Sequence, residues 1–188
     1  MEFADRVRPG GGKTVTACTP IRPLFLAASV FGAALAAPCP MRAATPSEVR
    51  SLRALPGVEV VVENPSQELI GLGLNTEQAR AEIQARLQER GVHILAEGDR
   101  PPGRPWLYFR MFAVKTEGVA TLAYFVTAQL RQDVSLDRNP DSHLGASTWD
   151  ASAGGLASAE TIAATVRAAA QDLADTFLTD YLTANARH

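Results

Sequence analysis

The stretch "WLYFRMFAVKTEGVATLAYFVTAQLRQDVSL", residues 106–136, decides the fold. Residues 106–115 and 119–136 are rich in aromatic and β-branched side chains, which fit the pleated surface of a strand. Only the short connection "TEG" separates them, and this length suits an antiparallel hairpin. The sequence therefore predicts two long, neighbouring strands that dominate a sheet.

Both alternating faces of this hairpin carry large apolar groups. Along its first strand these are Trp106, Tyr108 and Phe112 on one face and Leu107, Phe109 and Met111 on the other. Helices on one side of a sheet cannot cover both faces, so we expect the uncovered face to be a binding surface, an oligomer contact or a patch for a lipid-like ligand. The residues of this possible binding surface, with two arginines as polar anchors, are Trp106, Tyr108, Arg110, Phe112, Tyr124 and Arg131.

The residues before the hairpin predict a β-α-β unit. "GVEVVVEN", residues 57–64, alternates apolar and charged side chains and indicates a strand. Asn75 is placed to cap a helix that Gly91 ends, and "GVHIL", residues 91–95, indicates a short second strand, parallel to the first through a right-handed crossover. The apolar stripe of the helix is Ala79, Ile83 and Leu87, and the pair expected on its more polar side is Glu82 and Arg86.

The residues after the hairpin predict one more strand and a long helix. "DRNPDS", residues 137–142, reads as a turn, and "HLGASTWD", residues 143–150, as a strand. "ASAGGLAS", residues 151–158, is interpreted as a flexible connection. Residues 159–184 then predict an amphipathic helix with the stripe Ile162, Val166, Ala169, Leu173 and Phe177.

These elements define the fold class. The order β-α-β-β-β-β-α predicts an α+β, two-layer sandwich in which two helices cover one face of a mixed, mostly antiparallel sheet. We assign residues 56–188 to a single α+β domain and residues 37–55 to a linker and a short helix that ends before Pro56.

Residues 1–36 resemble a signal peptide. The apolar run 24–37 would span roughly 21 Å as a helix, which is too short for a hydrocarbon layer of about 30 Å. Basic residues precede it and Ala34-Leu35-Ala36 offers a cleavage site after Ala36, so we expect export to the periplasm; a retained N-terminal anchor is the alternative. Pro38 before Cys39 disfavours a lipid anchor, and loss of Cys18 with the signal peptide leaves no intramolecular disulfide.

The balance of charge limits the partners. The formal net charge is -2, with charged residues 20% and apolar residues 46% of the chain. This gives no basic footprint for nucleic acid or for an anionic membrane surface. We therefore expect membrane contact only through a retained N-terminal segment or, less favourably, a lipid anchor.

Three partial motifs suggest chemistry but each lacks parts that the chemistry needs. "GLGLNT", residues 71–76, has two glycines of a dinucleotide loop, yet residues 64–70 separate it from the strand and Thr76 replaces the third glycine. Residues 137–141 resemble the start of a calcium loop without its glycine or its final Glu, and Ser147 is one glycine short of a nucleophile elbow. We expect no cofactor and no metal.

Titratable residues give no stronger indication of catalysis. The histidines are too scattered to hold zinc. Four aspartates could converge in space as catalytic carboxylates, but acidic residues near strand ends are more often only solvated: Asp133, Asp137, Asp141 and Asp150. We expect a protein that is not an enzyme.

Several stretches carry a resemblance. The run from "LPGVEVVVE" through "LRQDVSL" and "STWD" to "FLTDYLTAN" resembles a group of uncharacterised exported bacterial proteins, which implies export and this fold but no site. The element order is also loosely similar to the amino-terminal domain of TolB and to LptE. The leading hypothesis is a non-catalytic envelope accessory protein that binds a protein partner or itself through a sheet face or edge; the alternatives are a carrier of a hydrophobic small molecule or lipid, and a hydrolase.

Overall fold

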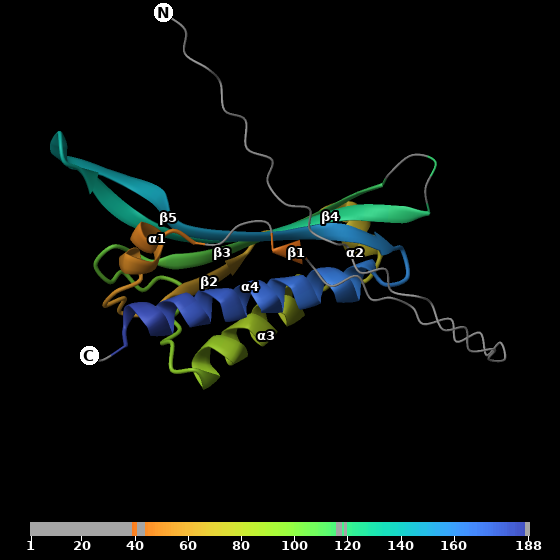
Figure 1. The fold of residues 1–188 in the computed structure, drawn as a ribbon, viewed down its shortest axis with the longest axis horizontal. Coiled ribbons are helices and arrows are strands. Elements are labelled where there is room, and N and C mark those ends of the chain that lie inside the picture. Colours follow the sequence, from red (N-terminus) through yellow and green to blue (C-terminus); the bar gives the residue numbers. More distant parts are fainter. Residues whose placement is uncertain (1–38, 41–43, 116–117, 119, 187–188) are drawn as a thin grey trace, which may run out of the picture. The chain divides into compact units, whose positions relative to one another are not determined.

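A mixed sheet is built around the hairpin that the sequence predicts (Figure 1). The computed structural model describes residues 39–40, 44–115, 118 and 120–186, and across these the five strands lie in the order β1-β5-β4-β3-β2. The elements are β1 Cys39–Pro40, α1 Pro46–Ser51, β2 Glu59–Val62, α2 Gln67–Gly71, α3 Thr76–Glu89, β3 Trp106–Lys115, β4 Thr121–Leu136, β5 Asn139–Ser158 and α4 Ile162–Ala184. The signal segment expected over residues 1–36, with Cys18, lies outside the described residues.

Two antiparallel pairings form most of the sheet. β3 pairs with β4 from Trp106 opposite Arg131 to Lys115 opposite Leu122. β4 pairs with β5 over nearly its whole length, and β1 adds a short antiparallel pairing on the outer side of β5, at Ala153 and Gly154. The long hairpin of the sequence-based prediction is therefore confirmed, and residues 39–40, which fall in the expected linker, belong to the sheet.

The parallel partner of β2 is β3, which differs from the prediction. β2 aligns residue by residue with the first half of β3, from Glu59 beside Trp106 to Val62 beside Phe109. The expected strand at residues 91–95 is reduced to a single parallel bridge between Val58 and Ile94. This segment is too short to extend the sheet because its first residues complete the end of α3.

Helices α3 and α4 pack against one face of the sheet, as Figure 1 shows, and no helix of the described part of the chain covers the other face. Alternate residues between Leu107 and Ala113 of β3 and between Leu122 and Leu130 of β4 are buried on the side of the helices: Leu107, Phe109, Met111 and Ala113, with Leu122, Tyr124, Val126, Ala128 and Leu130. Trp149 of β5 lies edge-on to Phe177 of α4, with 5.2 Å between ring centroids. The core thus lies between a single helical layer and the sheet. Within the described residues, no helix is long and apolar enough to span a membrane.

Two glycines end helices by the same local device. Gly91 follows α3 with a φ of +83°; its N–H donates to the Gln88 carbonyl, and the Val92 N–H donates to the Leu87 carbonyl at 3.1 Å. Gly73 does the same after α2 with a φ of +93°. The helix α2 was not expected from the sequence, and it explains "IGLGLN" as a helix end rather than a phosphate loop. The predicted cap of α3 is confirmed, because the Asn75 side chain accepts from the Gln78 N–H at 3.0 Å.

The stretch "ASAGGLAS" is a strand, and its interpretation as a flexible connection is wrong. β5 continues through it to Ser158. Gly155 lies opposite Tyr124, and a Cβ built at Gly155 would be 3.0 Å from the Tyr124 hydroxyl oxygen. The absent side chain therefore makes room for a ring of the neighbouring strand, and this long-range contact orders a segment that local sequence makes flexible.

A bulge divides the β4–β5 pair into a core part and an arm. Leu130 faces Trp149 but Arg131 faces Ser147, so Thr148 is the extra residue. Its hydroxyl accepts from the Gln132 amide at 2.7 Å, and its carbonyl accepts from the Ser51 hydroxyl at the end of α1. Beyond the bulge the two strands continue as an arm, residues 132–146, which rises away from α3 and α4 (Figure 1).

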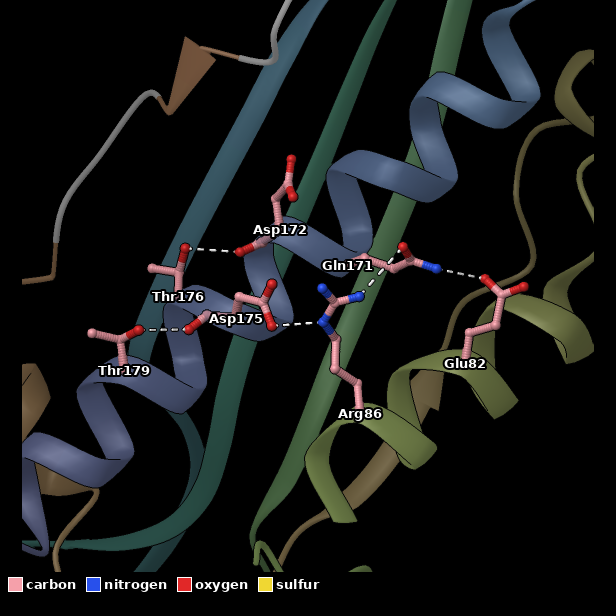
Figure 2. A network of polar contacts seen from close by, with 7 residues as sticks. All are labelled: Glu82, Arg86, Gln171, Asp172, Asp175, Thr176 and Thr179. Carbon is pink, nitrogen blue, oxygen red and sulfur yellow. Dashed lines mark hydrogen bonds and ion pairs between the residues drawn. The ribbon is translucent and has the colours of Figure 1, made fainter. Parts of the chain in front are cut away.

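A polar seam joins α3 to α4 (Figure 2). The Arg86 Nε donates to Asp175 at 2.6 Å, and the Gln171 amide donates to Glu82 at 2.7 Å. The hydrogen bond to Asp175 is the main cause that raises the pKa of Arg86 above its ordinary value. Glu82 and Arg86, expected as a pair within their own helix, instead fix the position of α3 along α4.

Candidate binding surface

We call the sheet face that points away from α3 and α4 the open face. Five of the six residues expected to form a binding surface lie on it: Trp106, Tyr108, Arg110, Phe112 and Arg131. Tyr124 does not. It is 4% exposed and buried with the core, because it neighbours Phe125, which pairs with Phe112 on the open face, and successive residues of a strand point to opposite sides.

One half of the open face is a cluster of aromatic and charged groups. The Tyr108 hydroxyl donates to the Glu63 carboxylate, and the Arg110 Nε lies 3.3 Å from the same carboxylate. The Arg131 guanidinium lies over the Tyr108 ring, 4.5 Å from its centroid, and also donates to the Gln129 amide oxygen at 3.0 Å. The Tyr108 ring is therefore held by a carboxylate at its edge and a cation on its face.

This cluster also shifts the ionisation of Tyr108. Its hydrogen bond to Glu63, together with burial, raises the pKa of Tyr108 above the ordinary 10.0, while Arg131 and Arg110 oppose the rise. The phenol therefore stays protonated and keeps donating throughout the neutral range. Tyr108 is thus a constant hydrogen-bond donor rather than a group that exchanges its proton near neutral pH.

The other half of the open face is an apolar band across three strands. Phe112 and Phe125 are cross-strand neighbours with 5.4 Å between ring centroids. One row further, Val114, Ala123 and Leu156 lie side by side on β3, β4 and β5. Val114 is 56% and Leu156 60% exposed, which is high for large apolar side chains on neighbouring strands. The band is continuous and solvent-facing, as an interaction surface is.

A cavity of about 240 Å³ lies where the open face meets the edge strand β2. Glu59 and Val61 of β2 and Trp106 and Tyr108 of β3 form its floor. The loop between α3 and β3 supplies the rest of the lining: Leu95, Asp99, Pro101, Arg104 and Pro105. The sequence did not indicate Glu59 or Asp99 as site residues, because Glu59 comes beside Trp106 only through the parallel pairing of β2 with β3, and Asp99 joins them only through the fold of the α3–β3 loop.

The other candidate residues are not assembled into a recognisable active site. The Ser147 hydroxyl donates to the Trp149 carbonyl at 3.2 Å, so its hydrogen bond goes to the backbone and not to a base. Asp133 lies opposite Gly145 on the arm, and Asp137 and Asp141 lie near its tip. Among the described residues, no three His, Cys, Asp or Glu side chains gather as a metal site would require.

No protein-family model, curated protein or solved structure matches this chain.

Proposed function

We propose that the protein is an exported, non-catalytic accessory protein of the bacterial envelope that binds a protein partner through the open face. The observation that carries this proposal is the asymmetry of the sheet: helices bury one face, while the other presents ordered aromatic rings, two arginines and a contiguous apolar band. Export rests on the signal-peptide pattern of residues 1–36.

The composition of the open face favours a protein as the occupant. Aromatic and arginine side chains are enriched at the centres of protein interfaces, where a few of them supply most of the binding energy. Here Arg110 and Arg131 flank the rings and are already oriented by Glu63, Gln129 and Tyr108. Side chains held in place before binding lose less conformational entropy when a partner arrives.

The test is site-specific photo-crosslinking in the cells that produce the protein. A photoreactive phenylalanine analogue at Phe112 should capture one defined partner, whereas the same analogue at Glu77 should not, since Glu77 lies on α3 with 74% of its side chain exposed. The captured protein is then purified and titrated with the wild-type chain. Phe112→Ala should weaken binding by about 2 kcal/mol, or roughly thirtyfold.

Three results bear on the proposal. Capture of a second copy of the chain at Phe112 would show that the open face mediates self-association and not binding to a different protein. Equal capture at Phe112 and Glu77 shows that crosslinking reports collision and not a docking surface. No capture at Phe112, from a chain that is folded and exported, refutes the proposal.

A specific cavity favours a second candidate function, a carrier of a hydrophobic ligand. It has a volume of about 340 Å³, lies at the ends of α2, β3 and β4, and is lined mainly by apolar atoms: Glu68, Gly71, Leu72, Lys115, Leu122 and Ala159. Mass spectrometry of protein purified without detergent should then show a retained apolar molecule that Leu72→Gln removes. A ligand-free wild-type chain contradicts the carrier and leaves the protein partner unaffected.

A further inference from the structure

The cavity between β2 and the α3–β3 loop has the chemistry of a cation receptor. It is lined by two aromatic residues, Trp106 and Tyr108, and by two acidic residues, Glu59 and Asp99. An aromatic face attracts a guanidinium or ammonium group, and a carboxylate at the rim adds a charge-assisted hydrogen bond. The same sheet already shows the first of these contacts, since Arg131 lies over Tyr108.

The nearby arginines do not cancel the attraction of the cavity for a cation. Arg104 is the cation of the lining, and its guanidinium lies 3.9 Å from Asp133 on the arm, outside the lining. Arg100 donates to the Asp99 carbonyl and not to its carboxylate. One Asp99 carboxylate oxygen accepts from the Ala96 N–H at 2.8 Å, which leaves the other oxygen and the Glu59 carboxylate for a ligand. The lining is therefore net negative once Arg104 is paired with Asp133.

The cavity wall is fixed before any ligand arrives. The Gly103 carbonyl accepts from the Asp133 N–H at 2.7 Å, which ties the loop to β4. The Arg104 N–H donates to the Pro101 carbonyl at 3.0 Å, and the Asp99 N–H donates to the Ala96 carbonyl at 3.1 Å. On the opposite side the Trp106 ring lies 3.4 Å from the position that a Cβ would take at Gly145. A wall held in this way binds with a small loss of entropy.

The size of the cavity selects a side chain rather than a larger molecule. At about 240 Å³ it lies below the roughly 300–1,000 Å³ of pockets for drug-sized ligands. It also opens beside the aromatic half of the open face, since Trp106 and Tyr108 belong to both. We propose that this cavity receives the guanidinium or ammonium group of a basic side chain on the partner of the open face, an inference that rests on the proposed function.

The test uses Nα-acetyl-arginine methylamide as the probe and its neutral citrulline counterpart as the control. Binding is followed by the NMR signal of the Trp106 indole N–H. The Trp149 indole N–H, fully buried and bonded to Asp180, is the internal reference. The arginine probe should shift the Trp106 signal saturably and bind about tenfold more tightly than the citrulline compound.

Two charge-removing variants distinguish the effect of a carboxylate in the cavity from the effect of the overall charge of the protein on probe binding. Glu59→Gln should weaken arginine binding about tenfold, and Glu77→Gln, the same charge change on the exposed side of α3, should leave it unchanged. Asp99→Asn provides a second variant from the loop wall if Glu59→Gln does not fold. Equal affinity for the arginine and citrulline compounds, or equal weakening by Glu77→Gln, overturns the cation site.

Combination with crosslinking at Phe112 distinguishes this inference from the proposed function. Reduced capture of the partner in Glu59→Gln, together with probe binding, supports the inference. Capture that Glu59→Gln does not change overturns the inference and leaves the protein partner standing. Probe binding without any capture overturns the partner as the source of the cation and assigns the cavity to a free guanidinium or ammonium compound.

Discussion

Gly155→Ala should destabilise the protein although it replaces glycine in a strand. Two effects oppose each other. Alanine restricts the unfolded chain and favours the strand by about 0.5–1 kcal/mol. A Cβ at this position would lie 3.0–3.2 Å from the hydroxyl oxygen and two ring carbons of Tyr124, and this residue is 4% exposed, so the core resists its movement. Overpacking of this kind costs about 1–3 kcal/mol. We expect a net loss of about 1 kcal/mol.

Urea unfolding of four proteins measures this effect: wild type, Gly155→Ala, Tyr124→Leu and the double variant. In the Tyr124→Leu background the contact is removed, so Gly155→Ala should become neutral or stabilising, which gives a coupling free energy of about 1 kcal/mol or more. Gly71→Ala is the matched control, because a Cβ there meets nothing within 4 Å and should stabilise α2 slightly. If Gly155→Ala stabilises the wild-type chain, the Tyr124 ring yields and the packing argument is wrong.

Two further predictions concern the polar contacts. The raised pKa of Tyr108 means that the unfolded chain loses this proton before the folded chain does, so the contribution of Tyr108 to stability should be constant up to about pH 10 and be lost as pH rises through the folded pKa. Tyr108→Phe should remove part of this fall in alkaline unfolding curves, and identical curves for the two proteins would contradict the assignment. The side chains of Arg86 and Asp175 are 40% and 44% exposed, so this ion pair should contribute little. A double-mutant cycle with alanine should give a coupling free energy of about 0.2–1 kcal/mol that shrinks in about 1 M salt. A coupling well above this, insensitive to salt, would show that the seam is more sheltered from solvent than the structure indicates.

The sequence predicts the elements whose signals are local and long. Four such elements are confirmed: the hairpin, the Asn75 cap, the Gly91 stop and the C-terminal helix. Each depends on residues that lie close together in the sequence. α2 was missed because its five residues are too few to show a helical period.

The rest depends on contacts between residues far apart in the chain. The packing of the whole sheet decides which strand pairs in parallel with β2. The sequence alone does not show that this strand is β3 rather than residues 91–95. The sequence does not show that Tyr124 faces the core, because its side of the sheet is fixed by the register of β4 with β3. The cavity beside β2 could not be predicted from the sequence for the same reason, because Glu59 and Trp106 meet only after β2 and β3 have paired.

The arm beyond the Thr148 bulge has a consequence for the evolution of this protein. None of its described residues is buried, and the bulge is held by Gln132 and by Ser51 rather than by anything further along the arm. Substitutions and insertions near its tip, residues 137–141, therefore leave the free energy of the core almost untouched. Related proteins are free to lengthen, shorten or recharge the arm, and a reporter peptide inserted there should be displayed without loss of folding.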